Sequence, residues 1–219
     1  MEREISYGRL ILGFIVAALL ISAVFVIYEP DNLEEEKDLV TDEIPEIDRN
    51  TQEDYSTATF GVGCFWGPEA RLGVVDGVIR TRVGYLEING SILDDSGSKR
   101  EAVQADYDPE RLSYEYLYDL ISEMGEIEEY NQSAEFSLAD RYQQHYRIGQ
   151  HEELSKGFRR TYPEVGNFVN STAASKINGY LTGYSHLDSR EDLKGFGLTE
   201  EGMEEVYYLW NIRLRGCCF

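Results

Sequence analysis

The chain has 219 residues, of which 41 are Asp or Glu and 20 are Lys or Arg, so its formal net charge at pH 7 is -21. That length is enough for one well-cored domain with an appendage, but hardly for a second full domain. Because phosphate binding needs a basic face, the excess of acidic residues excludes nucleic acid as a partner.

An apolar run covers residues 10–28 near the N-terminus. A helix of that length nearly crosses the hydrocarbon core of a bilayer, so we predict a transmembrane helix. Arg3 and Arg9 precede the run and acidic residues follow it, so the positive-inside rule places residues 1–9 in the cytoplasm. The sequence therefore predicts a single-pass membrane protein with an extracytoplasmic catalytic domain. A cleaved signal peptide is the alternative interpretation.

The next segment, residues 29–56, is rich in acidic side chains and has almost no aromatic or β-branched periodicity. Such a segment repels itself and has little apolar surface to bury. We therefore predict a disordered linker between the transmembrane helix and a catalytic domain at residues 57–219.

Regular patterns begin at residue 57. The predicted strands are 57–63, 78–85 and 101–107, and the predicted helices that accompany them are 68–73 and 114–124. This order indicates an α+β fold, a ferredoxin-like split βαβ plait, which needs one more strand, expected near residues 135–138. Further helices are predicted at 140–153, 171–181 and 199–209. They form a helical C-terminal extension from about residue 147, which ends in a cysteine tail at residues 213–219.

Cys64 ends the first predicted strand, directly before a predicted helix. A thiol in that position lies near unpaired N–H groups and the positive end of the helix dipole, which favours the thiolate. A lone cysteine is otherwise often a small buried apolar residue. Phe65 and Trp66 follow it beside a glycine, and two successive large aromatic side chains in such a turn can hardly both face the core. We therefore interpret Cys64 as a nucleophile.

The residues around Cys64 resemble a family signature. Gly63-Cys64-Phe65-Trp66-Gly67, followed by Glu69, is similar to the motif of the type A peptide methionine sulfoxide reductases. Four further segments resemble that family in the same order: Val83-Gly84-Tyr85, Glu101-Ala102-Val103, Tyr107-Asp108-Pro109 and residues 139–146. The resemblance runs from about Thr57 to Tyr146. The family's D-x-G-x-Q-Y-R-S segment has no counterpart between Gly125 and Leu138.

The resemblance implies an oxidoreductase that reduces the S-epimer of methionine sulfoxide, in proteins or free, and so repairs oxidised proteins. It implies that Cys64 attacks the sulfoxide sulfur and that Glu101 protonates the sulfoxide oxygen. The implied substrate-binding residues are Phe65 and Trp66 around the S-methyl group and Tyr85 at the oxygen. Our own hypothesis is that Tyr142 or Tyr130 substitutes for the absent segment. No cofactor and no metal are expected, since three widely separated histidines offer no zinc spacing.

Cys217 and Cys218 are the only other cysteines. The resemblance implies that one of them condenses with the oxidised Cys64 and that a thioredoxin-like dithiol reopens the disulfide. A tail for lipid attachment or metal binding is the alternative interpretation.

Two other functions remain open from the sequence. The first is a catalytically silent module that uses Phe65 and Trp66 to bind methionine-containing peptides or a membrane partner. The second is a general peroxide-reducing thiol protein. Rapid oxidation of Cys64 by a sulfoxide substrate would separate an enzyme from a binding module.

Overall fold

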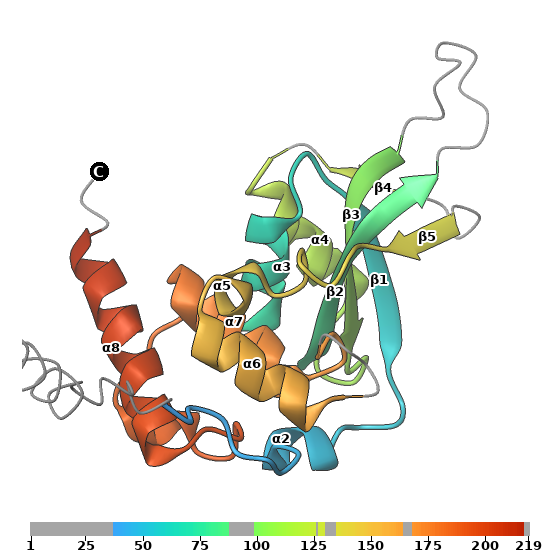
Figure 1. Cartoon of the computed structure of the whole chain (residues 1–219). Coiled ribbons are helices and arrows are strands. Elements are labelled where there is room, and N and C mark those ends of the chain that lie inside the picture. The colour runs from blue at the N-terminus through green and yellow to red at the C-terminus, as the bar shows by residue number, and fades with distance from the viewer. Residues whose placement is uncertain (1–36, 88–98, 126, 130–134, 164–167, 217–219) are drawn as a thin grey trace, which may run out of the picture. The chain divides into compact units, whose positions relative to one another are not determined.

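The computed structural model describes residues 37–87, 99–125, 127–129, 135–163 and 168–216 (Figure 1). The predicted cytoplasmic segment at 1–9, the predicted transmembrane helix at 10–28, and the cysteines Cys217 and Cys218 lie outside these residues. The strands are β1 (Ser56–Gly61), β2 (Val78–Glu87), β3 (Lys99–Tyr107), β4 (Glu128–Glu129) and β5 (Glu135–Leu138). The helices are α2 (Glu46–Arg49), α3 (Trp66–Gly73), α4 (Tyr114–Ser122), α5 (Tyr146–Gly149), α6 (Glu152–Thr161), α7 (Thr172–Thr182), the 3-10 helix η1 (Arg190–Leu193) and α8 (Glu200–Gly216).

The strands form one antiparallel sheet in the order β4-β1-β3-β2-β5. Both β1 and β2 pair antiparallel with β3, so they run parallel to each other with β3 between them. The chain crosses from β1 to β2 through α3, and this split βαβ unit places the end of β1 next to the start of α3. The further strand predicted near residues 135–138 is present as β5, but it lies beside β2. The position beside β1, at the opposite edge, is taken by the short strand β4.

The predicted transmembrane helix and membrane localisation are also corrected. Within the part of the chain that the structure describes, no helix is both long enough and apolar enough to cross a bilayer. The described residues form a mixed helix and sheet domain, and the single-pass topology is not retained.

One hydrophobic core lies between the sheet and its helices. It is built from alternate residues of the strands, such as Phe60 in β1 and Val103 in β3, together with Leu72 of α3 and Leu117 of α4. These four side chains are completely buried. Because successive side chains of a strand point to opposite faces, the core-facing residues of β1 alternate with more exposed ones.

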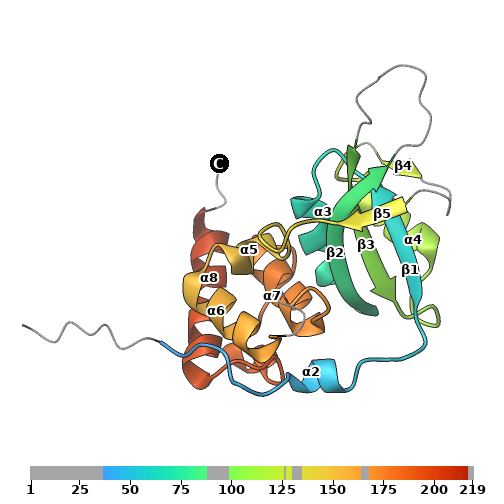
Figure 2. The same cartoon turned by 45° about the vertical axis from the view of Figure 1, so that its right-hand side comes forward.

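A second hydrophobic core lies among α5, α6, α7 and α8, which Figure 2 shows grouped beside the sheet. Residues 37–41, which we call the N-terminal strap, close this core. Leu39 and Val40 of the strap are buried, and Val40 forms an isolated antiparallel bridge with Leu198. Arg160 of α6 donates a hydrogen bond to the Val40 carbonyl oxygen and pairs with Asp38.

The predicted disordered linker at 29–56 is therefore wrong for residues 37–55, which are described and include the strap and α2. Two adjacent apolar side chains, Leu39 and Val40, supply the buried surface that the acidic composition of the segment conceals. The predicted helix at 140–153 also differs: residues 141–145 form turns, and the helix begins only at Tyr146. His145 has a left-handed φ of 47°, which prevents a continuous helix through this point.

The two cores meet where α3 packs against α7. A Cβ atom at Gly73 would lie 2.4 Å from the carbonyl oxygen of Ser175, and one at Gly179 would lie 2.6 Å from that of Ala70. The two helices therefore approach as closely as their backbones allow. Ser175 also accepts a hydrogen bond from the backbone N–H of Thr81, which ties α7 to β2.

Candidate active site

Cys64 lies in the short connection between β1 and α3, and its free thiol is exposed. The connection is fixed at its start, because the N–H of Val62 donates to the backbone oxygen of Glu101 at 2.8 Å. The preceding Gly63 is uncovered, since a Cβ atom built on it would meet nothing within 4 Å. The thiol is thus held beside a helix N-terminus and is reachable from outside the protein.

The Glu101 carboxyl group lies against the same connection. Its Oε2 accepts a hydrogen bond of 2.9 Å from the N–H of Phe65, the residue directly after Cys64. Antiparallel pairing places Glu101 of β3 opposite Tyr85 of β2. The fold therefore brings together the predicted nucleophile and the predicted acid, which are 37 positions apart in the sequence.

The predicted aromatic residues have different environments. Phe65 is only 2% exposed and belongs to the sheet core, whereas Trp66 is 39% exposed. The Phe65 ring lies 5.9 Å from that of Tyr85, whose hydroxyl bonds to Gln143 at 3.1 Å. Trp66 therefore offers the accessible aromatic surface, and Phe65 supports the wall beneath it.

The ring that covers Trp66 is that of Tyr146, which sequence reasoning did not assign. The two rings are stacked, with centroids 4.1 Å apart and an angle of 8° between their planes. The predicted Tyr142 is 65% exposed, and its hydroxyl accepts a hydrogen bond from Arg141. The other predicted substitute, Tyr130, lies outside the described residues.

Glu69 and His145 form a fully buried pair that connects α3 to the segment carrying Tyr146. The N–H of His145 donates to both carboxyl oxygens of Glu69, at 3.3 and 3.2 Å. Burial raises the pKa of Glu69 to about 8, against a smaller opposing effect of this hydrogen bond. Burial likewise lowers the pKa of His145 to about 4. Both pKa shifts favour the uncharged forms of the two groups, although their atoms are near enough for a salt bridge.

Gln144 fastens the same segment to the sheet. Its side-chain oxygen accepts from the N–H of Val83 at 3.1 Å, and its side-chain nitrogen donates to the carbonyl oxygen of Val83 at 2.9 Å. The side chain thereby satisfies both backbone groups of a buried strand residue. The only sequence signal for Glu69, Gln144 and Tyr146 was their place within the family-like motifs.

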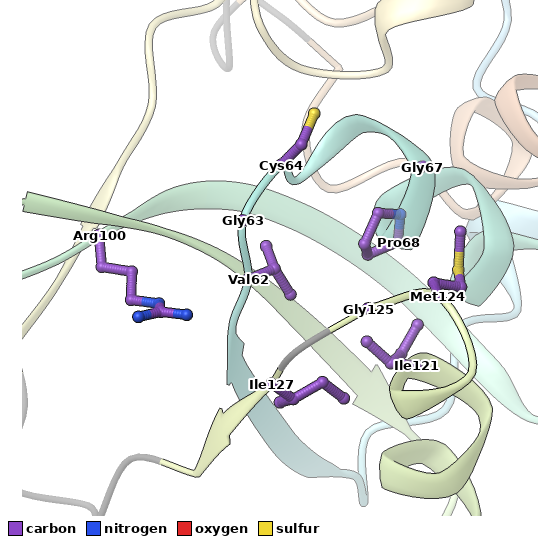
Figure 3. A pocket seen from close by; sticks show the side chains of 10 residues that line it. All are labelled: Val62, Gly63, Cys64, Gly67, Pro68, Arg100, Ile121, Met124, Gly125 and Ile127. Atoms are coloured by element: carbon purple, nitrogen blue, oxygen red, sulfur yellow. The ribbon is translucent and has the colours of Figure 1, made fainter.

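A cavity of about 510 Å³ lies beside Cys64, between α3, α4 and the chain after α4 (Figure 3). Its apolar wall comes from Val62, Pro68, Ile121, Met124 and Ile127, and Arg100 lies at one side. Figure 3 shows the Cys64 side chain pointing away from Ile121 and Ile127. Cys64 therefore borders the cavity while directing its sulfur elsewhere.

Within the described residues, no group of three or more His, Cys, Asp or Glu side chains is arranged to hold a metal ion. An exposed thiol beside a carboxyl group and an aromatic ring is instead suited to an enzyme whose nucleophile is a cysteine.

Comparison with known proteins agrees with this class. The family model described as "Peptide methionine sulfoxide reductase" matches residues 56–145. A relative of that name from Drosophila melanogaster is 28% identical in an alignment over 198 residues, which covers 70% of this chain and 79% of the relative. The enzyme MsrA of Thermoactinomyces vulgaris is 44% identical over 69 residues, 29% of this chain and 56% of the relative. MsrA 1 of a Nostoc species is 40% identical over 74 residues, 31% of this chain and 45% of the relative.

These matches support an MsrA-type member of the peptide methionine sulfoxide reductase family, and with it an oxidoreductase that acts on peptide methionine sulfoxide. The family resemblance inferred from the sequence motifs is thereby confirmed. The match spans only about half the length of the two bacterial relatives, and the family model ends at residue 145, before α5.

Proposed function

We propose that the protein reduces the S-epimer of methionine sulfoxide, in proteins or free, through the Cys64 thiolate. Reduction of methionine sulfoxide is the activity named for the relatives. The observation that carries the proposal for this chain is the exposed thiol of Cys64 with the Glu101 carboxyl group bonded to the next peptide N–H.

In the proposed reaction, the Cys64 sulfur attacks the sulfoxide sulfur while Glu101 donates a proton to the sulfoxide oxygen. The oxygen then passes to the sulfur of Cys64, as its bond to the methionine sulfur breaks. The methionine sulfur gains the two electrons that the cysteine sulfur loses. The products are methionine and a Cys64 sulfenic acid.

The role we assign to Trp66 is to hold the S-methyl group against its exposed ring, with Tyr146 fixing the plane of that ring. Phe65 serves as a buried support. The Tyr85 hydroxyl is the proposed donor to the sulfoxide oxygen, for which it exchanges its hydrogen bond to the side-chain oxygen of Gln143. Tyr142 is given no role at the oxygen, because its side chain is 65% exposed at the surface.

For a second turnover the sulfenic acid must be reduced. We propose that the thiol of Cys217 or Cys218 attacks the sulfenic sulfur, forming a disulfide and releasing water. A thioredoxin-like dithiol then reduces the disulfide and is itself oxidised.

The test is a stereospecific assay on separated methionine sulfoxide epimers with dithiothreitol as the reductant. The wild-type chain is expected to consume the S-epimer, and Cys64→Ser to consume neither. A Cys217→Ser and Cys218→Ser double variant should still release one methionine per Cys64 in the absence of reductant. Continued turnover by Cys64→Ser would reject the proposal.

A further inference from the structure

The cavity beside Cys64 is larger than the proposed reaction requires. We propose that it binds an apolar side chain of a polypeptide substrate, from a residue adjacent in sequence to the oxidised methionine. This inference rests on the proposed function, because it names the substrate class that the same site prefers.

The position of the cavity supports this occupant. Cys64 borders the cavity, but its side chain points away from Ile121 and Ile127 (Figure 3). The groups proposed to hold the sulfoxide, Glu101 and Trp66, are absent from the cavity lining. A methionine sulfoxide bound at the sulfur therefore leaves the cavity free for another part of the substrate.

The backbone between Cys64 and the cavity has free space beside it at Gly63. Gly63 lines the cavity, and a Cβ atom on it would meet nothing within 4 Å. Consecutive residues of an extended peptide are about 3.5 Å apart along the chain. A residue next to the oxidised methionine can thus pass over Gly63 and place its side chain within the cavity.

The size and chemistry of the cavity also suit an apolar side chain. Its volume of about 510 Å³ lies within the range of ligand sites, roughly 300–1,000 Å³. Pro68, Met124 and Ile127 present carbon and sulfur atoms to it, and the unbranched Met124 side chain can adapt to differently shaped partners. A leucine side chain placed here leaves water for an apolar surface, whereas a glycine gains nothing.

The experiment compares capped tripeptides with the S-epimer at the centre and either leucine or glycine on each side. The full chain is assayed with dithiothreitol as the reductant. A leucine on the side that reaches the cavity should raise kcat/KM about tenfold over glycine, the lower end of what an apolar pocket discriminates. Equal kcat/KM values for all the peptides would overturn the inference while leaving the proposed function intact.

Two variants locate the preference. Met124→Glu places a carboxylate at a cavity-lining side chain that is already 37% exposed, so folding should tolerate it. The ratio of kcat/KM for the leucine and glycine peptides should then fall to near one. Tyr116→Glu is the matched control, because Tyr116 is exposed on α4 and does not line the cavity. An unchanged ratio in Met124→Glu would place the preference elsewhere and reject the cavity as its source.

Binding to the Cys64→Ser chain separates the two proposals if no peptide is turned over. Calorimetric titration with the same peptides should still show tighter binding of the leucine peptide. Tighter binding without turnover would support the cavity and reject the reductase. If the leucine peptide is neither bound more tightly nor turned over, the cavity proposal and the reductase proposal are both rejected.

Discussion

The protein has two regions with different roles. The sheet region runs from β1 to β5, and the helical region consists of α5 to α8 with the N-terminal strap. Cys64, Glu101 and Trp66, which carry the proposed chemistry, come from the sheet region, and the family match ends at residue 145. The helical region has its own core, and its residue Tyr146 stacks on Trp66 at the site. Chemistry and support are therefore encoded in different parts of the chain, so they can be perturbed separately.

The largest effect is expected from removing the acid in the sheet region. Glu101→Gln keeps an oxygen that can accept from the N–H of Phe65 but cannot deliver a carboxyl proton. We expect kcat to fall by about a hundredfold to ten-thousandfold, as for the loss of a general acid, with folding unchanged. Steady-state sulfoxide reduction measures kcat, and circular dichroism measures folding. Glu110→Gln, an exposed substitution just after β3, is the control and should leave kcat unaltered.

The helical region is tested through the strap. Leu39→Ala removes a side chain that is 1% exposed, and we expect the free energy of unfolding to fall by about 3 kcal/mol, as for other buried leucines. Urea denaturation measures the loss. Lys37→Ala, whose exposed ion pair with Glu201 spans 3.4 Å, should change it by less than about 1 kcal/mol. Equal effects of the two substitutions would contradict a structural role for the strap.

The buried pair of Glu69 and His145, which connects the two regions, predicts a pH dependence of stability. The pKa of Glu69 is raised from 4.5 to about 8, so between these values the folded chain keeps a proton that the unfolded chain releases. Its contribution to the free energy of unfolding therefore decreases as the pH rises through this window. His145, whose pKa is lowered from 6.5 to about 4, has the opposite effect between pH 4 and 6.5.

The effects of Glu69 and His145 oppose each other below pH 6.5. A net decrease in the free energy of unfolding should therefore be visible from pH 6.5 to 8. Its slope should be at most about 1.4 kcal/mol per pH unit. Glu69→Gln retains an acceptor for the N–H of His145 but cannot ionise, so its denaturation midpoint should stay level over this range. A parallel decline in the variant would show that other groups cause the loss.

The smallest effect is expected at the stacked rings. Tyr146→Ala removes the partner of Trp66 and should raise KM about two- to tenfold, because an aromatic pair contributes roughly 0.5–1.5 kcal/mol. Tyr146→Phe retains the ring and should keep KM within twofold of the wild type. Substrate titration at fixed enzyme concentration measures both. Equal KM values for the two variants would mean that Tyr146 does not position Trp66.

The sequence identified the sheet region better than the helical region. Strands β1, β2 and β3 alternate and are bounded by glycine and proline, so their positions followed from pattern alone. The sequence did not predict the strap, because Leu39 and Val40 lie in an acidic stretch. Their partners, such as Leu198, are distant in the sequence. Burial by such distant partners leaves no local periodicity to detect.

At the site, the exposed position of Tyr142 has a backbone cause. A helix through residues 140–153 would have directed Tyr142 and His145 to one face. The turn that ends at His145, with its positive φ, instead directs Tyr146 to Trp66. Side-chain bonds from Gln144 to Val83 and from Glu69 to His145 hold this turn, and neither is visible in a linear pattern.

The bridge between Val40 and Leu198 joins residues 158 positions apart, and the N–H of Thr199 donates to the carbonyl oxygen of Leu39. Synthesis proceeds from the N-terminus, so the strap emerges from the ribosome long before its partners. The sheet strands can assemble while translation continues, but the strap cannot complete its pairing until Leu198 and Thr199 have been made. Premature termination anywhere before Leu198 would therefore leave Leu39 and Val40 exposed to chaperones and proteases.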